Sequence, residues 1–177
     1  MELTDIDKES LPKKENGELQ LVVFQIAGCE LGIGIRQVRE IIRVSEMTMM
    51  PKAPKFLEGI INLRGRIVPV LDLKRRFDMP LIEKTDESRV LVMEIHDQAL
   101  GLLVDKVVEV LKISAERIEP VLEPFLNIGT DFIAGKICIN QRLVLLFRIE
   151  KTFSFDDARA LPDWEKASLV GVKNLGH

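Results

Sequence analysis

The segment EGIINLRGRIVPVLDL, residues 58–73, carries most of the information about how this chain folds. Two short runs of β-branched and other apolar residues flank the dipeptide Arg64-Gly65, a pattern typical of two strands joined by a tight turn. Gly65 can adopt the positive φ that such a turn requires, and Asn62 can accept a hydrogen bond from the turn backbone. The segment therefore predicts a β-hairpin.

Other residues of the same segment indicate where its strands pack and end. Pro69 has no backbone N–H to give to a strand ladder, so we expect it at a sheet edge or a bulge. Asp72 precedes the sequence LKRRF, where it is placed to cap one turn of helix. Gly59 has a counterpart in Gly135, and we expect close backbone approaches at both glycines.

The chain contains an internal repeat. A shift of 69 residues places residues 19–44 over 88–113, and a shift of 76 places 56–73 over 132–149. The identical pairs include glycines and charges as well as apolar residues: Val23/Val92, Ile26/Ile95, Leu31/Leu100, Gly32/Gly101, Val38/Val107, Glu40/Glu109, Phe56/Phe132, Gly59/Gly135, Ile61/Ile137, Arg66/Arg142 and Val68/Val144. Chance similarity of two β-rich segments does not account for glycines and charges at equal spacing. The larger second shift indicates an insertion within 119–131.

Each copy supplies about five short strands, enough to close a small barrel and hide its edges. We therefore predict an all-β fold with short helices, in which two similar five-stranded β-barrels pack side by side about a groove. The first barrel is expected within residues 19–80 and the second within 88–150. Residues 1–18 are polar and are expected to form a flexible arm, and residues 151–177 are expected to lie outside both barrels.

Composition narrows the classes of partner. The chain has 177 residues, of which 46% are hydrophobic and 30% are charged, so it can bury a core and remain soluble. Its net charge of −3 lacks the basic footprint of a nucleic-acid-binding protein. The charged and polar first residues are not expected to form a signal peptide, and no apolar run approaches the ~20 residues of a membrane span. We expect a cytoplasmic protein that reaches a membrane only through another protein.

The sequence offers little for catalysis or cofactor binding. Cys29 and Cys138 have no CxxC spacing and are expected to be reduced thiols, and His96 and His177 have no ligand partners at metal spacing. Nucleophile-elbow, Walker A and zinc-protease motifs are absent. The carboxylates are scattered, and the equivalence of Glu40 and Glu109 favours a shared structural role. We therefore expect no enzymatic activity, no cofactor and no metal.

The segment 58–73 resembles the signature of the CheW-like domain family, which runs G-x-x-N-L-R-G-x-x-x-P-x-x-D-L. The chain matches it at Gly59, Asn62, Leu63, Arg64, Gly65, Pro69, Asp72 and Leu73. Upstream, residues 38–41 resemble the family's V-x-E-I, and residues 103–107 contain its V-D-x-V. The resemblance extends over roughly residues 19–150.

This resemblance implies two SH3-like barrels and an adaptor function without chemistry. In the family, the adaptor couples the cytoplasmic tip of methyl-accepting chemoreceptors to the regulatory domain of the histidine kinase CheA. Carried over by motif position, the receptor-binding candidates are Val38, Glu40 and Arg64. The kinase-binding candidates are Leu57 and Gly59. The protein would then lie at the inner face of the membrane through receptor binding.

Arg64 has Asn140 as its counterpart in the second copy, so the repeat itself does not require an arginine there. Three interpretations stay open: a solvated surface residue, a docking residue, or an arginine held in the turn or in the contact between the barrels. Docking is plausible because the planar guanidinium suits carboxylates and carbonyls at interfaces. Two other functions stay open: an adaptor of another chemosensory pathway, such as surface motility or gene regulation, and an enzyme for a small molecule on a divergent barrel.

Overall fold

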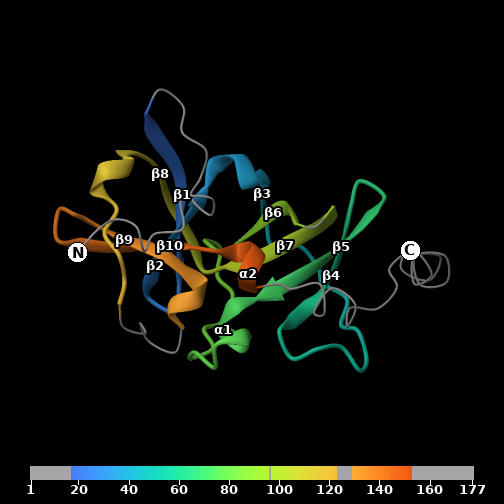
Figure 1. The fold of residues 1–177 in the computed structure, drawn as a ribbon. Coiled ribbons are helices and arrows are strands. Elements are labelled where there is room, and N and C mark those ends of the chain that lie inside the picture. Colours follow the sequence, from blue (N-terminus) through green and yellow to red (C-terminus); the bar gives the residue numbers. More distant parts are fainter. Residues whose placement is uncertain (1–16, 96, 123–128, 153–177) are drawn as a thin grey trace.

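The computed structural model describes residues 17–95, 97–122 and 129–152 (Figure 1). The first copy of the repeat supplies β1 (Glu18–Ile26), β2 (Cys29–Gly34), β3 (Val38–Arg43), β4 (Leu57–Leu63) and β5 (Arg66–Asp72), followed by α1 (Leu73–Arg76). The second copy supplies β6 (Arg89–Ile95), β7 (Gln98–Val104), β8 (Lys106–Ser114), β9 (Ile133–Ile139) and β10 (Arg142–Phe147), followed by α2 (Ile149–Thr152). Single 3-10 turns lie at Ile35–Gln37, Ala115–Arg117 and Thr130–Phe132.

The strands form two five-stranded sheets that lie beside each other in Figure 1. Sheet A has the order β8-β1-β2-β10-β9, and sheet B has the order β3-β6-β7-β5-β4. The predicted fold class, mostly β with short helices and two five-stranded units, is confirmed. Within the described residues, no helix is long and apolar enough to cross a bilayer.

Each sheet contains strands from both copies of the repeat. Sheet A contains β1 and β2 of the first copy and three strands of the second. Sheet B contains three strands of the first copy and β6 and β7 of the second. The copies meet in the antiparallel pairs β1–β8 and β3–β6 and in the parallel pairs β2–β10 and β5–β7. The expectation of one barrel within 19–80 and another within 88–150 is therefore wrong, because the chain leaves its first sheet after two strands.

The apolar run of β1 explains how the sheets share a core. Leu19, Leu21 and Val23 are buried in a cluster with residues of sheet A. The alternating Phe24 and Ile26 are buried in a second cluster, which contains residues of both sheets. Because successive side chains of a strand point to opposite faces, β1 is covered on both sides. A third cluster, which includes Val68, Val70 and Val90, lies within sheet B.

The predicted close approaches at the paired glycines are confirmed. In both sheets, the segment that follows an edge strand reaches the opposite edge strand through an isolated bridge: Thr48 with Ile60 in sheet B, and Glu119 with Lys136 in sheet A. A Cβ on Gly59 would lie 3.0 Å from the Thr48 carbonyl oxygen, and one on Gly135 would lie 2.9 Å from that of Glu119. Each glycine lets the chain fold across its own sheet.

The β4–β5 turn also has the predicted chemistry. Arg64 and Gly65 have φ values of 50° and 84°, and the Gly65 N–H donates to Asn62 Oδ1 at 2.9 Å. The Asp72 side chain accepts from the Lys74 N–H at 2.9 Å and so caps α1, as predicted.

Pro69 is not at an edge, since β5 lies between β7 and β4. Its antiparallel partner Ile60 uses its own N–H and C=O with Thr48, so the Ile60–Pro69 pair does not require a proline N–H. The parallel ladder with β7 begins at Val70, one residue later. Pro69 therefore occupies an interior strand without leaving a broken ladder.

The expectations for the N-terminal arm and the C-terminal tail fall largely on residues 1–16 and 153–177, outside the described part of the chain. Within the described part, Glu18 already belongs to β1 and Lys151 to α2.

We expect Gly135→Ala to lower the free energy of unfolding by about 1–3 kcal/mol, because the added methyl group would overlap Ile118 and the Glu119 backbone. Gly32→Ala is the matched control, since its Cβ would have no neighbour nearer than 3.4 Å. Urea unfolding of both variants measures the difference. Equal stabilities would show that the crossing at Gly135 tolerates a side chain.

Candidate protein-docking site

A hollow of about 310 Å³ opens on sheet B, where β3, the β4–β5 hairpin and the β6–β7 hairpin meet. Its lining combines apolar residues with ion-pairing ones: Arg39, Glu40, Leu63, Arg64, Arg66, Val68, Val92, Met93, Glu94 and Ala99. We call this feature the sheet B hollow. An apolar lining with fixed charges is typical of a surface that binds another protein.

Two of the receptor-binding candidates meet at this hollow. The Arg64 guanidinium, on the β4–β5 turn, pairs with the Glu40 carboxylate on β3. These elements come from the two opposite ends of the strand order of sheet B, so the ion pair joins the two edges of the sheet at the hollow. The Arg64 side chain is 73% exposed and can also reach a partner. The third candidate, Val38, is half-buried and packs against the core shared by the two sheets.

A second ion pair lies nearby, between Arg39 on β3 and Glu94 on β6, at 2.8 Å. Arg66 differs from the other arginines of the hollow. Among the residues that the structure describes, its side chain makes no hydrogen bond or ion pair. Sequence reasoning recognised Arg66 as part of the repeat but gave it no functional role.

The kinase-binding candidates occupy interior positions. Leu57 is 5% exposed and belongs to the core shared by the two sheets. Gly59 is covered by Met47 and Thr48. Neither residue presents a side chain at the surface, and Gly59 lies beneath the segment that covers β4.

In sheet A, the arginine that corresponds to Arg66 is Arg142, and it is paired within the chain. Arg142 on β10 donates to Glu30 on β2 at 2.6 and 3.1 Å and to Glu109 on β8 at 2.9 Å. These hydrogen bonds raise the pKa of the Arg142 guanidinium. Glu40 and Glu109 thus both accept from an arginine of another hairpin, but the two arginines, Arg64 and Arg142, are not counterparts in the repeat.

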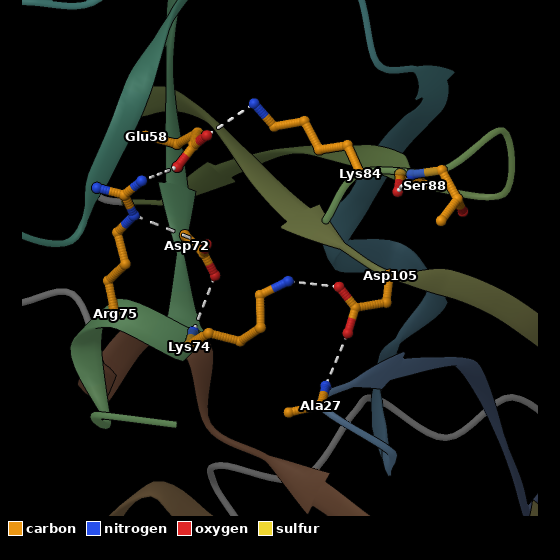
Figure 2. Close-up of polar contacts among 9 residues, drawn as sticks. Ala27, Glu58, Asp72, Lys74, Arg75, Lys84, Ser88 and Asp105 are labelled. Carbon is orange, nitrogen blue, oxygen red and sulfur yellow. Dashed lines mark hydrogen bonds and ion pairs between the residues drawn. The ribbon is translucent and has the colours of Figure 1, made fainter. Parts of the chain in front are cut away.

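A buried polar network connects the two sheets (Figure 2). Lys74 on α1 is 3% exposed, and its ammonium pairs with the Asp105 carboxylate at the end of β7. The other Asp105 oxygen accepts from the Ala27 N–H at 2.7 Å. Because Ala27 lies in the β1–β2 turn of sheet A and α1 follows a strand of sheet B, one carboxylate joins both sheets. Asp105 belongs to the V-D-x-V segment, the one sequence signal that pointed to it.

Further ion pairs lie beside this network, at α1 and β4. Glu58 on β4 accepts from Arg75 at 2.9 Å and from Lys84 at 2.7 Å, as Figure 2 shows. Burial raises the pKa of Asp72, and the neighbouring Lys74 and Arg75 offset only part of this effect. Burial likewise raises the pKa of the Cys29 thiol. Within the described ranges, no three His, Cys, Asp or Glu side chains gather as metal ligands.

Comparison with known proteins agrees with this architecture. The family model of the CheW-like domain matches residues 20–156. The chain is 33% identical over 144 residues to a probable chemotaxis protein CheW of Rhizobium etli, which covers 81% of this chain and 93% of that protein. It is 31% identical over 138 residues to the chemotaxis protein CheW of Klebsiella aerogenes, over 78% of this chain and 83% of that protein.

A solved structure gives the same result for the fold. The scaffolding protein TtCheW of Thermoanaerobacter tengcongensis superposes with a TM-score of 0.73 at 36% sequence identity. The match covers 81% of this chain and 92% of that structure.

We expect Lys74→Met to lower the free energy of unfolding by about 3–5 kcal/mol, because it leaves the Asp105 carboxylate in the interior without its cation. Lys55→Met is the control, since Lys55 and Asp78 form an ion pair with both side chains 73% exposed. Thermal and urea unfolding measure both variants. If the two cost the same, the inter-sheet network contributes no more than a surface pair.

Asp72 should make the protein less stable as the pH rises through the acidic range. Its folded pKa lies above the ordinary 3.8, so between these values the folded protein holds a proton that the unfolded chain has lost. The contribution of this group is therefore full below 3.8 and is lost as the pH rises through the folded pKa.

Asp72→Asn removes this titration, and its amide oxygen can still accept the Lys74 N–H. Relative to wild type, the variant should gain stability as the pH rises from about 4 to about 7. Urea unfolding at a series of pH values measures the difference. A constant difference, or one that moves the other way, would contradict the assignment.

Proposed function

The chain belongs to the CheW-like domain family and is a chemotaxis coupling adaptor, and we propose that it joins chemoreceptors to the histidine kinase CheA. The receptor partner is the cytoplasmic tip of a methyl-accepting chemoreceptor, and the kinase partner is the regulatory domain of CheA. The adaptor catalyses no reaction and works in the cytoplasm, at the inner face of the membrane, through its receptor. Receptor occupancy then biases the kinase by differential contacts with the assembled complex.

The observation that supports this proposal is the sheet B hollow, whose lining includes the Glu40–Arg64 ion pair. An exposed arginine fixed beside an apolar lining can anchor a helical tip, because guanidinium groups suit carboxylates and carbonyls at interfaces. Val38 and Glu40 lie on the same edge strand. We therefore place the receptor on the side of sheet B formed by β3 and the β4–β5 turn.

We place the kinase on the segment that crosses β4. Gly59 admits Met47 and Thr48 against this strand, and the next residue, Met49, is 66% exposed. Leu57 anchors the start of β4 in the core. In this proposal Leu57 and Gly59 support the kinase-binding surface from beneath, and a bulkier residue at Gly59 would displace it.

The test is a reconstituted kinase assay with receptor vesicles, CheA and this protein. Autophosphorylation of CheA should depend on both receptor and adaptor, and Arg64→Ala should weaken receptor binding by about thirtyfold, the effect of an interface hot spot. The melting temperature should change little, because the Arg64–Glu40 pair is exposed.

Asn140→Ala is the matched control, since Asn140 holds the same turn position in sheet A with φ of 48° against 50° for Arg64. It should bind the receptor like wild type. CheA autophosphorylation that does not change when the wild-type adaptor is added would refute the proposed function. Unchanged receptor binding by Arg64→Ala would refute the role of Arg64.

A further inference from the structure

An arginine that occurs at the same position in both copies of the repeat has different partners in the two sheets. Arg142 in sheet A holds two carboxylates, those of Glu30 and Glu109. Its counterpart in sheet B, Arg66, lines the hollow and makes no side-chain hydrogen bond or ion pair among the described residues. Within the described part of the chain, the arginine at this place in the repeat is therefore paired in sheet A and unpaired in sheet B.

The sequence differences that free Arg66 can be identified. The counterpart of Glu30 is Ala99, which occupies the same register: Glu30 pairs with Gln25 across the β1–β2 hairpin, and Ala99 pairs with Glu94 across the β6–β7 hairpin. The first carboxylate is thus replaced by a methyl group. The counterpart of Glu109 is Glu40, which pairs with Arg64 instead.

With alanine at position 99 instead of glutamate, Arg66 has no carboxylate at that position and the space of the glutamate side chain is empty. Ala99 and Arg66 line the same hollow of about 310 Å³, close to the lower end of the roughly 300–1,000 Å³ that binding pockets occupy. The hollow contains three arginines and two glutamates, so an additional negative group balances its charge. Its apolar lining includes Val68 and Val92, which suits the aliphatic part of an acidic side chain.

We propose that the sheet B hollow binds a carboxylate side chain of a docking partner, with Arg66 as the hydrogen-bond donor. The partner's carboxylate takes the place that Glu30 has in sheet A. This inference rests on the proposed function, since Glu40 and Arg64 border the same hollow. The partner is therefore the receptor tip, at a glutamate or aspartate that stands among apolar residues.

The test supplies the missing carboxylate within the chain. Ala99→Glu should pair with Arg66 as Glu30 pairs with Arg142 and so occupy the hollow. Ala99→Gln is the control, because it adds a side chain of nearly the same size without charge. Arg66→Gln removes the donor and leaves the hollow open. Titration calorimetry with a soluble cytoplasmic fragment of a chemoreceptor from the same organism measures binding, and thermal unfolding checks that each variant folds.

We expect Ala99→Glu and Arg66→Gln to weaken receptor binding by about thirtyfold or more, and Ala99→Gln to weaken it much less. Melting temperatures should stay at the wild-type value or rise in Ala99→Glu. Equal losses in Ala99→Glu and Ala99→Gln would overturn the inference, since the effect would then be one of size. Wild-type binding by a folded Arg66→Gln would overturn it as well. A wild-type protein that does not bind the fragment would instead refute the proposed function.

Discussion

The carboxylate of Asp105 is the contact on which the arrangement of the two sheets depends. It accepts from the Ala27 N–H in the β1–β2 turn of sheet A and pairs with the Lys74 ammonium on α1, which follows β5 of sheet B. Lys74 is almost completely buried, and an ammonium group is removed from water at a cost of several kcal/mol unless it is paired. A rotation of one sheet against the other that separated these three groups would leave the buried Lys74 ammonium without its carboxylate.

The exchange of strands between the copies places this contact between two sheets that already share a core. Each sheet contains strands of both copies, and the core that includes Phe24, Leu91 and Phe147 is shared. The covalent chain and the shared core hold the sheets together, but apolar packing is not directional. The Lys74–Asp105 ion pair is directional and so favours one orientation of the two sheets. At the equivalent place in the second copy, Glu150 accepts from Gln37 at 3.3 Å, so α2 is also joined to the other copy through a polar contact.

Local features of the fold could be predicted from the sequence, but the pairing of the strands could not. The Asn62–Gly65 turn, the Asp72 cap and the crossings at Gly59 and Gly135 each depend on a few neighbouring residues or on a visible repeat. The partner of β1 depends on a choice between two similar sequences, VREIIR in β3 and VVEVLK in β8, and either could cover it. The pairing that forms follows from the connections and the shared core, which no short segment encodes.

In the candidate site too, residues within a sequence motif could be predicted, whereas a contact between distant residues could not. The family motif identified Glu40 and Arg64, and the structure brings them together. It also pointed to Leu57 and Gly59, which a motif cannot distinguish from surface residues, since a buried position and a binding position are both constrained. Lys74 was missed because lysine is almost always solvated, and only the distant Asp105 makes its burial acceptable.

Duplication followed by divergence accounts for the chemical difference between the two faces. In sheet A, Arg142 is satisfied by Glu30 and Glu109, so its charges are neutralised within the chain. In sheet B, Ala99 replaces the first glutamate and Arg64 engages the second, which leaves Arg66 available. A guanidinium already held by two carboxylates gains little from a third, whereas an unpaired one at the edge of an apolar hollow gains a partner on docking. In the proposal made here, the face of sheet A contributes to stability and the hollow of sheet B contributes to binding, so that one small chain contacts its partner in a defined orientation.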